Sequence, residues 1–121
     1  MSGPENTVKS VNERRIREAS MADPEFLKEL IDLYLGDTFQ QLELLRESVA
    51  EGDCASVART AHRLKGSSGN VGAEILMRLC NQMEHSGRDN QAQDLGRLYR
   101  EIDQEFARVR GELALIKGKG I

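Results

Sequence analysis

Apolar residues recur at steps of three and four along a stretch of more than twenty residues, and no proline interrupts it. A stripe with this period covers one face of an α-helix about seven turns long. The two prolines stand at positions 4 and 24, so the chain beyond residue 24 lacks the strongest helix breaker. The stripe consists of Leu27, Leu30, Ile31, Tyr34, Leu35, Thr38, Leu42, Leu45 and Val49.

Three further stripes with the same period follow, separated by turn signals. Asp23 precedes the first helix and Gly52 ends it, and Asp53 begins a second helix over 54–68. The glycines of 69–72 predict a turn before a third helix that stops near Gly87, and a fourth helix extends to about 116. Short connections favour an all-α, antiparallel up-down-up-down four-helix bundle. The sequence also predicts a short extra N-terminal helix over 11–19.

Length and charge limit the class of protein. The 121 residues fit one domain, and we expect a disordered N-terminal tail over 1–10, the bundle over 11–116 and a flexible C-terminal tail over 117–121. Seventeen basic and twenty acidic residues give a net charge of −3, which argues against a nucleic acid partner. No apolar run predicts a membrane span or a signal core, so we expect a cytoplasmic protein, monomeric as one closed bundle can be.

His62 stands beside the apolar stripe of the second helix. It follows Ala61 and is therefore rotated by about 100° from the middle of that stripe, toward solvent or a groove edge. Its neighbours one turn away are Ala58, Arg59, Lys65 and Gly66, two very small and two basic. Space and positive charge around an exposed imidazole suit a phosphoryl group, although a lone helical histidine commonly has no role.

A metal site is the competing interpretation of the same histidine. Cys54, His62, Cys80 and His85 are the candidate ligands, but their spacing matches neither a CxxC nor an HxxxH pattern. The sequence therefore predicts no metal site, and two reduced, buried thiols.

The segment from Ala61 to Ala73, AHRLKGSSGNVGA, resembles the signature of histidine phosphotransfer (HPt) domains, AHxLKGSSxxxGA. The resemblance extends more loosely over about residues 15 to 115. It includes Phe26, Leu27, Tyr34, Thr38, Gly52, Asp53, Cys80, Met83, Glu84, Gly87 and Arg88.

This resemblance implies that His62 is a phosphoacceptor, Lys65 its electrostatic helper and Gly66 a residue that provides clearance. It also implies that the partners are receiver domains of response regulators or hybrid histidine kinases, which supply Mg²⁺, an aspartate and most of the catalysis. The chain itself would bind no cofactor. It would be a carrier without autonomous kinase activity, since no nucleotide-binding loop is present.

The geometry of a helical hairpin suggests a partner for His62. If the second and third helices pair about a centre near Ala73, His62 lies abreast of Glu84, eleven residues on the other side. The Glu84 carboxylate would then accept the Nδ1 hydrogen and leave Nε2 as the nucleophile. The alternative is that Glu84 is simply a solvated side chain.

A partner docking around His62 needs an apolar patch with a polar rim. The candidates for the patch are Met21, Phe26 and Ile75, and those for the rim are Arg59 and Arg63. Ordinary core filling or helix solvation would also explain these residues. The alternative function is a structural docking or inhibitory module that resembles HPt domains but transfers no phosphoryl group.

Overall fold

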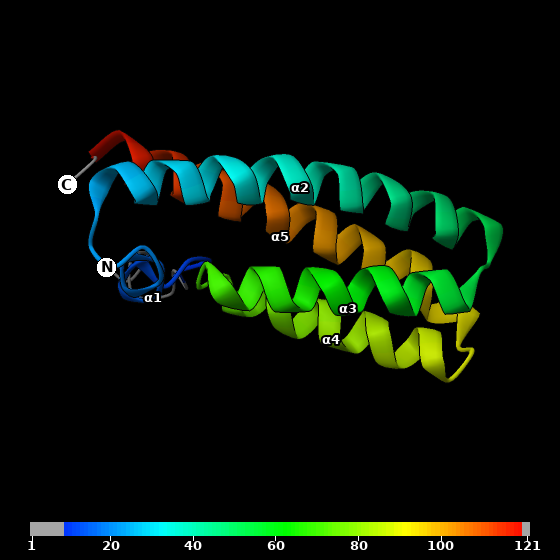
Figure 1. Cartoon of the computed structure of the whole chain (residues 1–121). Helices are drawn as coiled ribbons and strands as arrows, with labels where there is room; N and C mark the ends of the chain where they lie inside the picture. The colour runs from blue at the N-terminus through cyan, green and yellow to red at the C-terminus, as the bar shows by residue number, and fades with distance from the viewer. Residues whose placement is uncertain (1–8, 120–121) are drawn as a thin grey trace, which may run out of the picture.

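The computed structural model describes residues 9–119, which form five helices and, within that range, no strand. Figure 1 shows the long helices side by side, with the short helix α1 lying across one end. The helices are α1 (Glu13–Ala19), α2 (Pro24–Glu51), α3 (Cys54–Asn70), α4 (Glu74–Arg88) and α5 (Ala92–Lys119). Each long helix packs on the next, and α5 returns to α2, so the up-down-up-down bundle is confirmed.

The ends of α2 follow the predicted signals. The Asp23 side chain accepts hydrogen bonds from the backbone of Glu25 and Phe26, and Pro24 occupies the first turn. At the other end Gly52 adopts a left-handed conformation with φ of 67°.

The turn between α3 and α4 is shorter than the predicted 69–72. Gly69 and Asn70 are still helical, and the chain reverses over Val71, Gly72 and Ala73. A side-chain carbon at position 69 would lie 2.9 Å from the sulfur of Met77, a flexible side chain that could move aside. Gly69 is therefore part of α3 and lies outside the turn.

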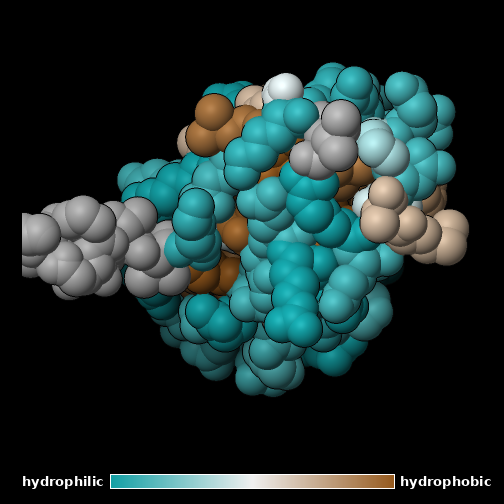
Figure 2. All heavy atoms as spheres, turned by 90° about the vertical axis from the view of Figure 1, so that its left-hand side faces the viewer, coloured by the Kyte–Doolittle hydropathy of each residue, from teal (hydrophilic) through white to brown (hydrophobic). Residues whose placement is uncertain are grey.

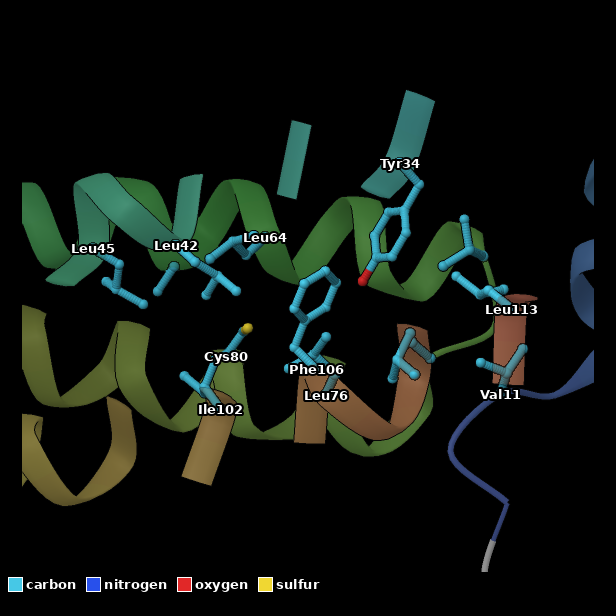
Figure 3. Close-up of a cluster of buried hydrophobic side chains, with 14 of the residues drawn as sticks. Val11, Tyr34, Leu42, Leu45, Leu64, Leu76, Cys80, Ile102, Phe106 and Leu113 are labelled. Atoms are coloured by element: carbon cyan, nitrogen blue, oxygen red, sulfur yellow. The ribbon is translucent and has the colours of Figure 1, made fainter. Parts of the chain in front are cut away.

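The core runs along the middle of the bundle, as Figure 3 shows. Side chains from all four long helices meet there, and Val11 closes one end. One buried hydrogen bond joins Tyr34 of α2 to Ser68 of α3, with 2.9 Å between the hydroxyl oxygens. The core thus fixes the position of α3 relative to α2 and α4.

The prediction of a disordered tail over 1–10 is wrong for its last residue, Ser10. Ser10 is buried, and the backbone N–H groups of Ser10 and Val11 donate to the Glu112 carboxylate at 3.0 and 2.8 Å. The Asn12 N–H donates to the Gly72 carbonyl at 2.8 Å. Residues 10–12, here called the N-terminal strap, therefore connect α5 to the α3–α4 turn. Residues 1–8 of the expected tail lie outside the described residues.

The prediction of a flexible tail over 117–121 is wrong for residues 117–119, because α5 continues to Lys119. Two ion pairs hold this last turn: Lys117 with Asp32 at 2.6 Å, and Lys119 with Glu13 at 3.4 Å. Residues 120–121 lie outside the described residues. Across 9–119, no helix combines the length and apolar character that a bilayer span requires.

Candidate functional site

His62 projects from the middle of α3. Its side chain is 63% exposed, whereas Ala61 beside it is fully buried, as the rotation from the apolar stripe predicts. The core holds the backbone of α3 while the imidazole is accessible to another molecule.

The antiparallel hairpin of α3 and α4 brings further polar residues to the histidine. His62 Nδ1 lies 3.0 Å from Glu84 Oε2, the pairing that a centre at Ala73 predicts. One turn further along α3, Lys65 Nζ donates to Asn81 Oδ1 at 3.3 Å, in the same register. The site is therefore built on two adjacent helices, without any loop.

Glu84 is a buried carboxylate with an exposed fraction of 1%, so the alternative of a solvated side chain is wrong. Lys65 Nζ lies 2.8 Å from Oε1 as an ion pair, although Oε1 receives no aligned hydrogen bond. Arg88, one turn beyond Glu84 on α4, pairs with Oε2. The Lys65 ammonium above all holds the pKa of Glu84 below its usual value, His62 and Arg88 act in the same direction, and burial opposes them.

The charge on Glu84 decides which imidazole nitrogen carries the hydrogen. An ionised carboxylate can only accept hydrogen bonds, so Nδ1 of His62 is the donor in this pair. In the neutral imidazole, Nε2 then keeps its lone pair. The outer nitrogen is the one that can act as a nucleophile.

A hollow of about 230 Å³ opens beside the imidazole. It is lined by Ala58, Arg59, His62 and Arg88. Arg88 has no predicted role, although the register that pairs 62 with 84 also places 88 abreast of 58. That register was the signal by which the sequence could have identified Arg88.

Gly66 lies in the middle of α3 and is exposed. A side-chain carbon built there would meet no atom of this chain within 4 Å. No packing contact within the described residues therefore requires glycine at this position.

The predicted docking residues lie apart from the hollow. Met21 is 78% exposed and lines a shallow depression with Arg14 and Arg17 of α1. Phe26 and Ile75 are half-buried in the first turns of α2 and α4.

The other predicted docking residues differ in how close they lie to the site. Ile75 is nine residues from Glu84 on α4, or about 14 Å along the helix axis. Of the two rim candidates, Arg59 lines the hollow, whereas Arg63 pairs with Asp37 of α2 at 2.8 Å.

The end of the bundle that carries α1 is mostly hydrophilic, with small hydrophobic areas between the polar side chains (Figure 2). A second hollow of about 570 Å³ there includes Val11, Leu115 and Ile116 in its lining, but none of the predicted site residues. Within 9–119, no three side chains of the metal-binding types come together. Cys54 and Cys80 are both free; Cys80 is buried as predicted, but Cys54 is only half-buried at the start of α3.

Comparisons with known proteins agree on one family. A family model described as the Hpt domain matches residues 29–112. Histidine-containing phosphotransfer protein B (HptB) from Pseudomonas aeruginosa PAO1 has a similar structure, with 26% identity and a TM-score of 0.87, covering 93% of this chain and 98% of that one. No curated protein sequence matches this chain significantly.

A second solved structure is the HPT domain of an Hpt sensor hybrid histidine kinase from Shewanella. It has 19% identity and a TM-score of 0.77, and covers 91% of this chain and 95% of that one. At this level of identity the likeness shows the fold alone.

Proposed function

Because this chain belongs to the Hpt domain family and is a histidine phosphotransfer protein of phosphorelays, we propose that His62 accepts and donates the phosphoryl group. The observation that carries this assignment is the 3.0 Å contact between His62 Nδ1 and Glu84. This contact holds the imidazole through Nδ1 and leaves the lone pair of Nε2 on the solvent-exposed side of the ring. His85, the other histidine, lies outside the hollow.

The charges around His62 suit an incoming phosphoryl group. Lys65 and Arg88 share the single carboxylate of Glu84, so the cluster has one positive charge in excess. Arg59 lines the same hollow. In the proposal, Lys65 and Arg88 stabilise the charge on the transferring group, and Arg59 supports them.

The small residues on α3 provide room for the reaction. Ala58 lines the hollow, and Gly66 leaves the surface one turn beyond His62 open. In the proposal, Gly66 provides clearance for the active site of the partner, because no other part of residues 9–119 packs against that position.

Family membership implies that the partners are receiver domains of response regulators or hybrid kinases. We propose that the receiver supplies Mg²⁺ and the aspartate, and that this chain acts as a cytoplasmic monomer that binds no cofactor itself. The contact would centre on Arg59 and the hollow and extend past Arg63. Met21, Phe26 and Ile75 would lie in its outer part, since none of them lines the hollow beside His62.

The test is transfer from receiver domains phosphorylated with acetyl phosphate, in the presence of Mg²⁺. The wild-type chain should gain a label that is labile in acid and stable in base, and His62→Gln should gain none. His85→Gln is the matched control and should be labelled like wild type. If a panel of receivers labels neither the wild-type chain nor the control, the alternative of a structural docking module is favoured.

A further inference from the structure

Glu84 differs from His62 in one respect that bears on the phosphorylated state. The carboxylate is 1% exposed, whereas the imidazole that it contacts is 63% exposed. The negative charge of Glu84 therefore acts on Nδ1 from the buried side of the ring, where water screens it weakly. Nε2 is on the solvent-exposed side, where the partner approaches.

We propose that Glu84 keeps the Nδ1 hydrogen on the imidazole after phosphorylation, and so keeps the phosphoryl group on a good leaving group. This inference rests on the proposed function of His62 and deepens it. Glu84 is a positioning residue here, because it acts through the imidazole and does not touch the phosphoryl group.

The bonds and charges balance without any proton transfer. In acceptance, the Nε2 lone pair forms the N–P bond, the P–O bond to the receiver aspartate breaks, and its electron pair leaves with the carboxylate. The ring is then a phosphoimidazolium that still carries its Nδ1 hydrogen. In donation, the receiver carboxylate attacks phosphorus and the N–P electron pair returns to Nε2, which restores the neutral ring.

Losing the Nδ1 hydrogen would change the leaving group. A deprotonated phosphoimidazole must release an imidazolide anion, whereas the protonated form releases neutral imidazole. Donation and spontaneous hydrolysis are therefore both faster from the protonated form. By holding that hydrogen near neutral pH, Glu84 makes the carrier ready to donate and also limits the lifetime of its phosphoryl group.

The other charged groups around the ring do not cancel this effect. On α3 these are Arg59 and Lys65, and on α4 Arg88 lies beside Glu84. All three are cations, and the phosphoryl dianion on Nε2 attracts them, which offsets their repulsion of a charged ring. On α2, the carboxylate of Asp37 pairs with Arg63.

The experiment follows the loss of phosphate from the isolated phosphorylated chain by ³¹P NMR between about pH 5 and pH 10, a range that spans imidazole titration. Glu84→Gln keeps an oxygen acceptor for Nδ1–H but removes the charge. We expect its pH–rate profile to move down by about one unit, with loss and donation about ten-fold slower near pH 8. Glu105→Gln removes another buried carboxylate, which pairs with Arg108 on α5, and should leave the profile unchanged.

A second measurement needs no variant. In ¹⁵N-histidine spectra of the phosphorylated wild-type chain, Nδ1 should keep its hydrogen to a pH about one unit higher in the folded chain than in urea. Superimposable titrations, or a Glu84→Gln profile like that of wild type, would overturn the inference and leave phosphotransfer intact. Failure of the proposed function looks different, because His62 would then take no label at all.

Discussion

Gly66 is a helical glycine, and among residues 9–119 no neighbouring side chain or other segment lies within 4 Å of where its side chain would begin. Glycine inside a helix is less stable than alanine by roughly 0.5–1 kcal/mol, so the folded chain would be more stable with alanine there. Stability of the fold therefore does not explain the glycine, which agrees with the proposed role in giving a partner access to His62.

We expect Gly66→Ala to raise the free energy of unfolding by roughly 0.5–1 kcal/mol and to slow transfer from a receiver about ten-fold or more. Urea unfolding and single-turnover transfer measure the two effects. Gly111→Ala is the matched control, since Gly111 is also helical with no atom near its missing side chain. It should give the same stabilisation with normal transfer; equal transfer rates in both variants would remove the clearance role.

Arg88 is a charged residue of the site to which the sequence assigned no role. It pairs with Glu84 and lines the hollow with an exposed fraction of 59%. We expect Arg88→Gln to slow phosphoryl acceptance by roughly ten-fold, because one charge-assisted contact to the phosphoryl group is lost. Arg97→Gln breaks a comparable surface pair with Glu101 on α5 and should leave transfer unchanged. Equal rates for the two variants would contradict the role of Arg88.

At the scale of elements, the N-terminal strap packs so closely on the α3–α4 turn that the turn has no room for a side chain at position 72. Gly72 has φ of 80°, and a side-chain carbon there would lie 2.6 Å from the Asn12 carbonyl oxygen. The glycine therefore meets two requirements at once, a left-handed backbone and a close approach of another backbone segment.

We expect Gly72→Ala to lower the free energy of unfolding by about 2 kcal/mol or more, since conformational strain and displacement of the strap add up. Gly52→Ala separates the two causes. Gly52 also has positive φ, at 67°, but open space around it, so its substitution should cost only the roughly 1–2 kcal/mol of strain. Equal losses in chemical denaturation would show that the strap contributes nothing.

The sequence predicted the helices because they depend on local periodicity. The contact of His62 with Glu84 needed only the position of the turn between the two helices. The roles of His62, Lys65 and Gly66 came from the resemblance to HPt domains and stay predictions. The strap was missed for a physical reason: Ser10 and Val11 are held by Glu112, more than a hundred residues away, and no local pattern encodes that contact. The last turn of α5 was missed because Lys117 and Lys119 form ion pairs with carboxylates that are distant in the sequence.

For the whole molecule, the buried polar groups of the core predict a limit to stability at high pH. Burial raises the pKa of Tyr34 and of Cys80 to about 12 each, from ordinary values of 10.0 and 9.0. The unfolded chain therefore gives up these two protons at lower pH than the folded chain. The stability that they contribute is complete below about pH 9 and is lost as pH rises toward 12.

We expect the free energy of unfolding to fall across this window by up to about 1.4 kcal/mol per pH unit for each group. Urea titrations at several pH values measure the slope. Tyr34→Phe also loses the hydrogen bond to Ser68, which lowers stability by a similar amount at every pH, but it should make the slope shallower. An unchanged slope in this variant would show that the phenol does not contribute to the limit.

The contact between the strap and Glu112 also has a consequence for protein synthesis. Val11 leaves the ribosome long before its hydrogen-bond acceptor, which is translated 101 residues later. The hairpin of α3 and α4, which carries His62 and Glu84, also leaves the ribosome before Glu112 does. The contact that closes the end of the bundle carrying α1 is therefore one of the last that the growing chain can form.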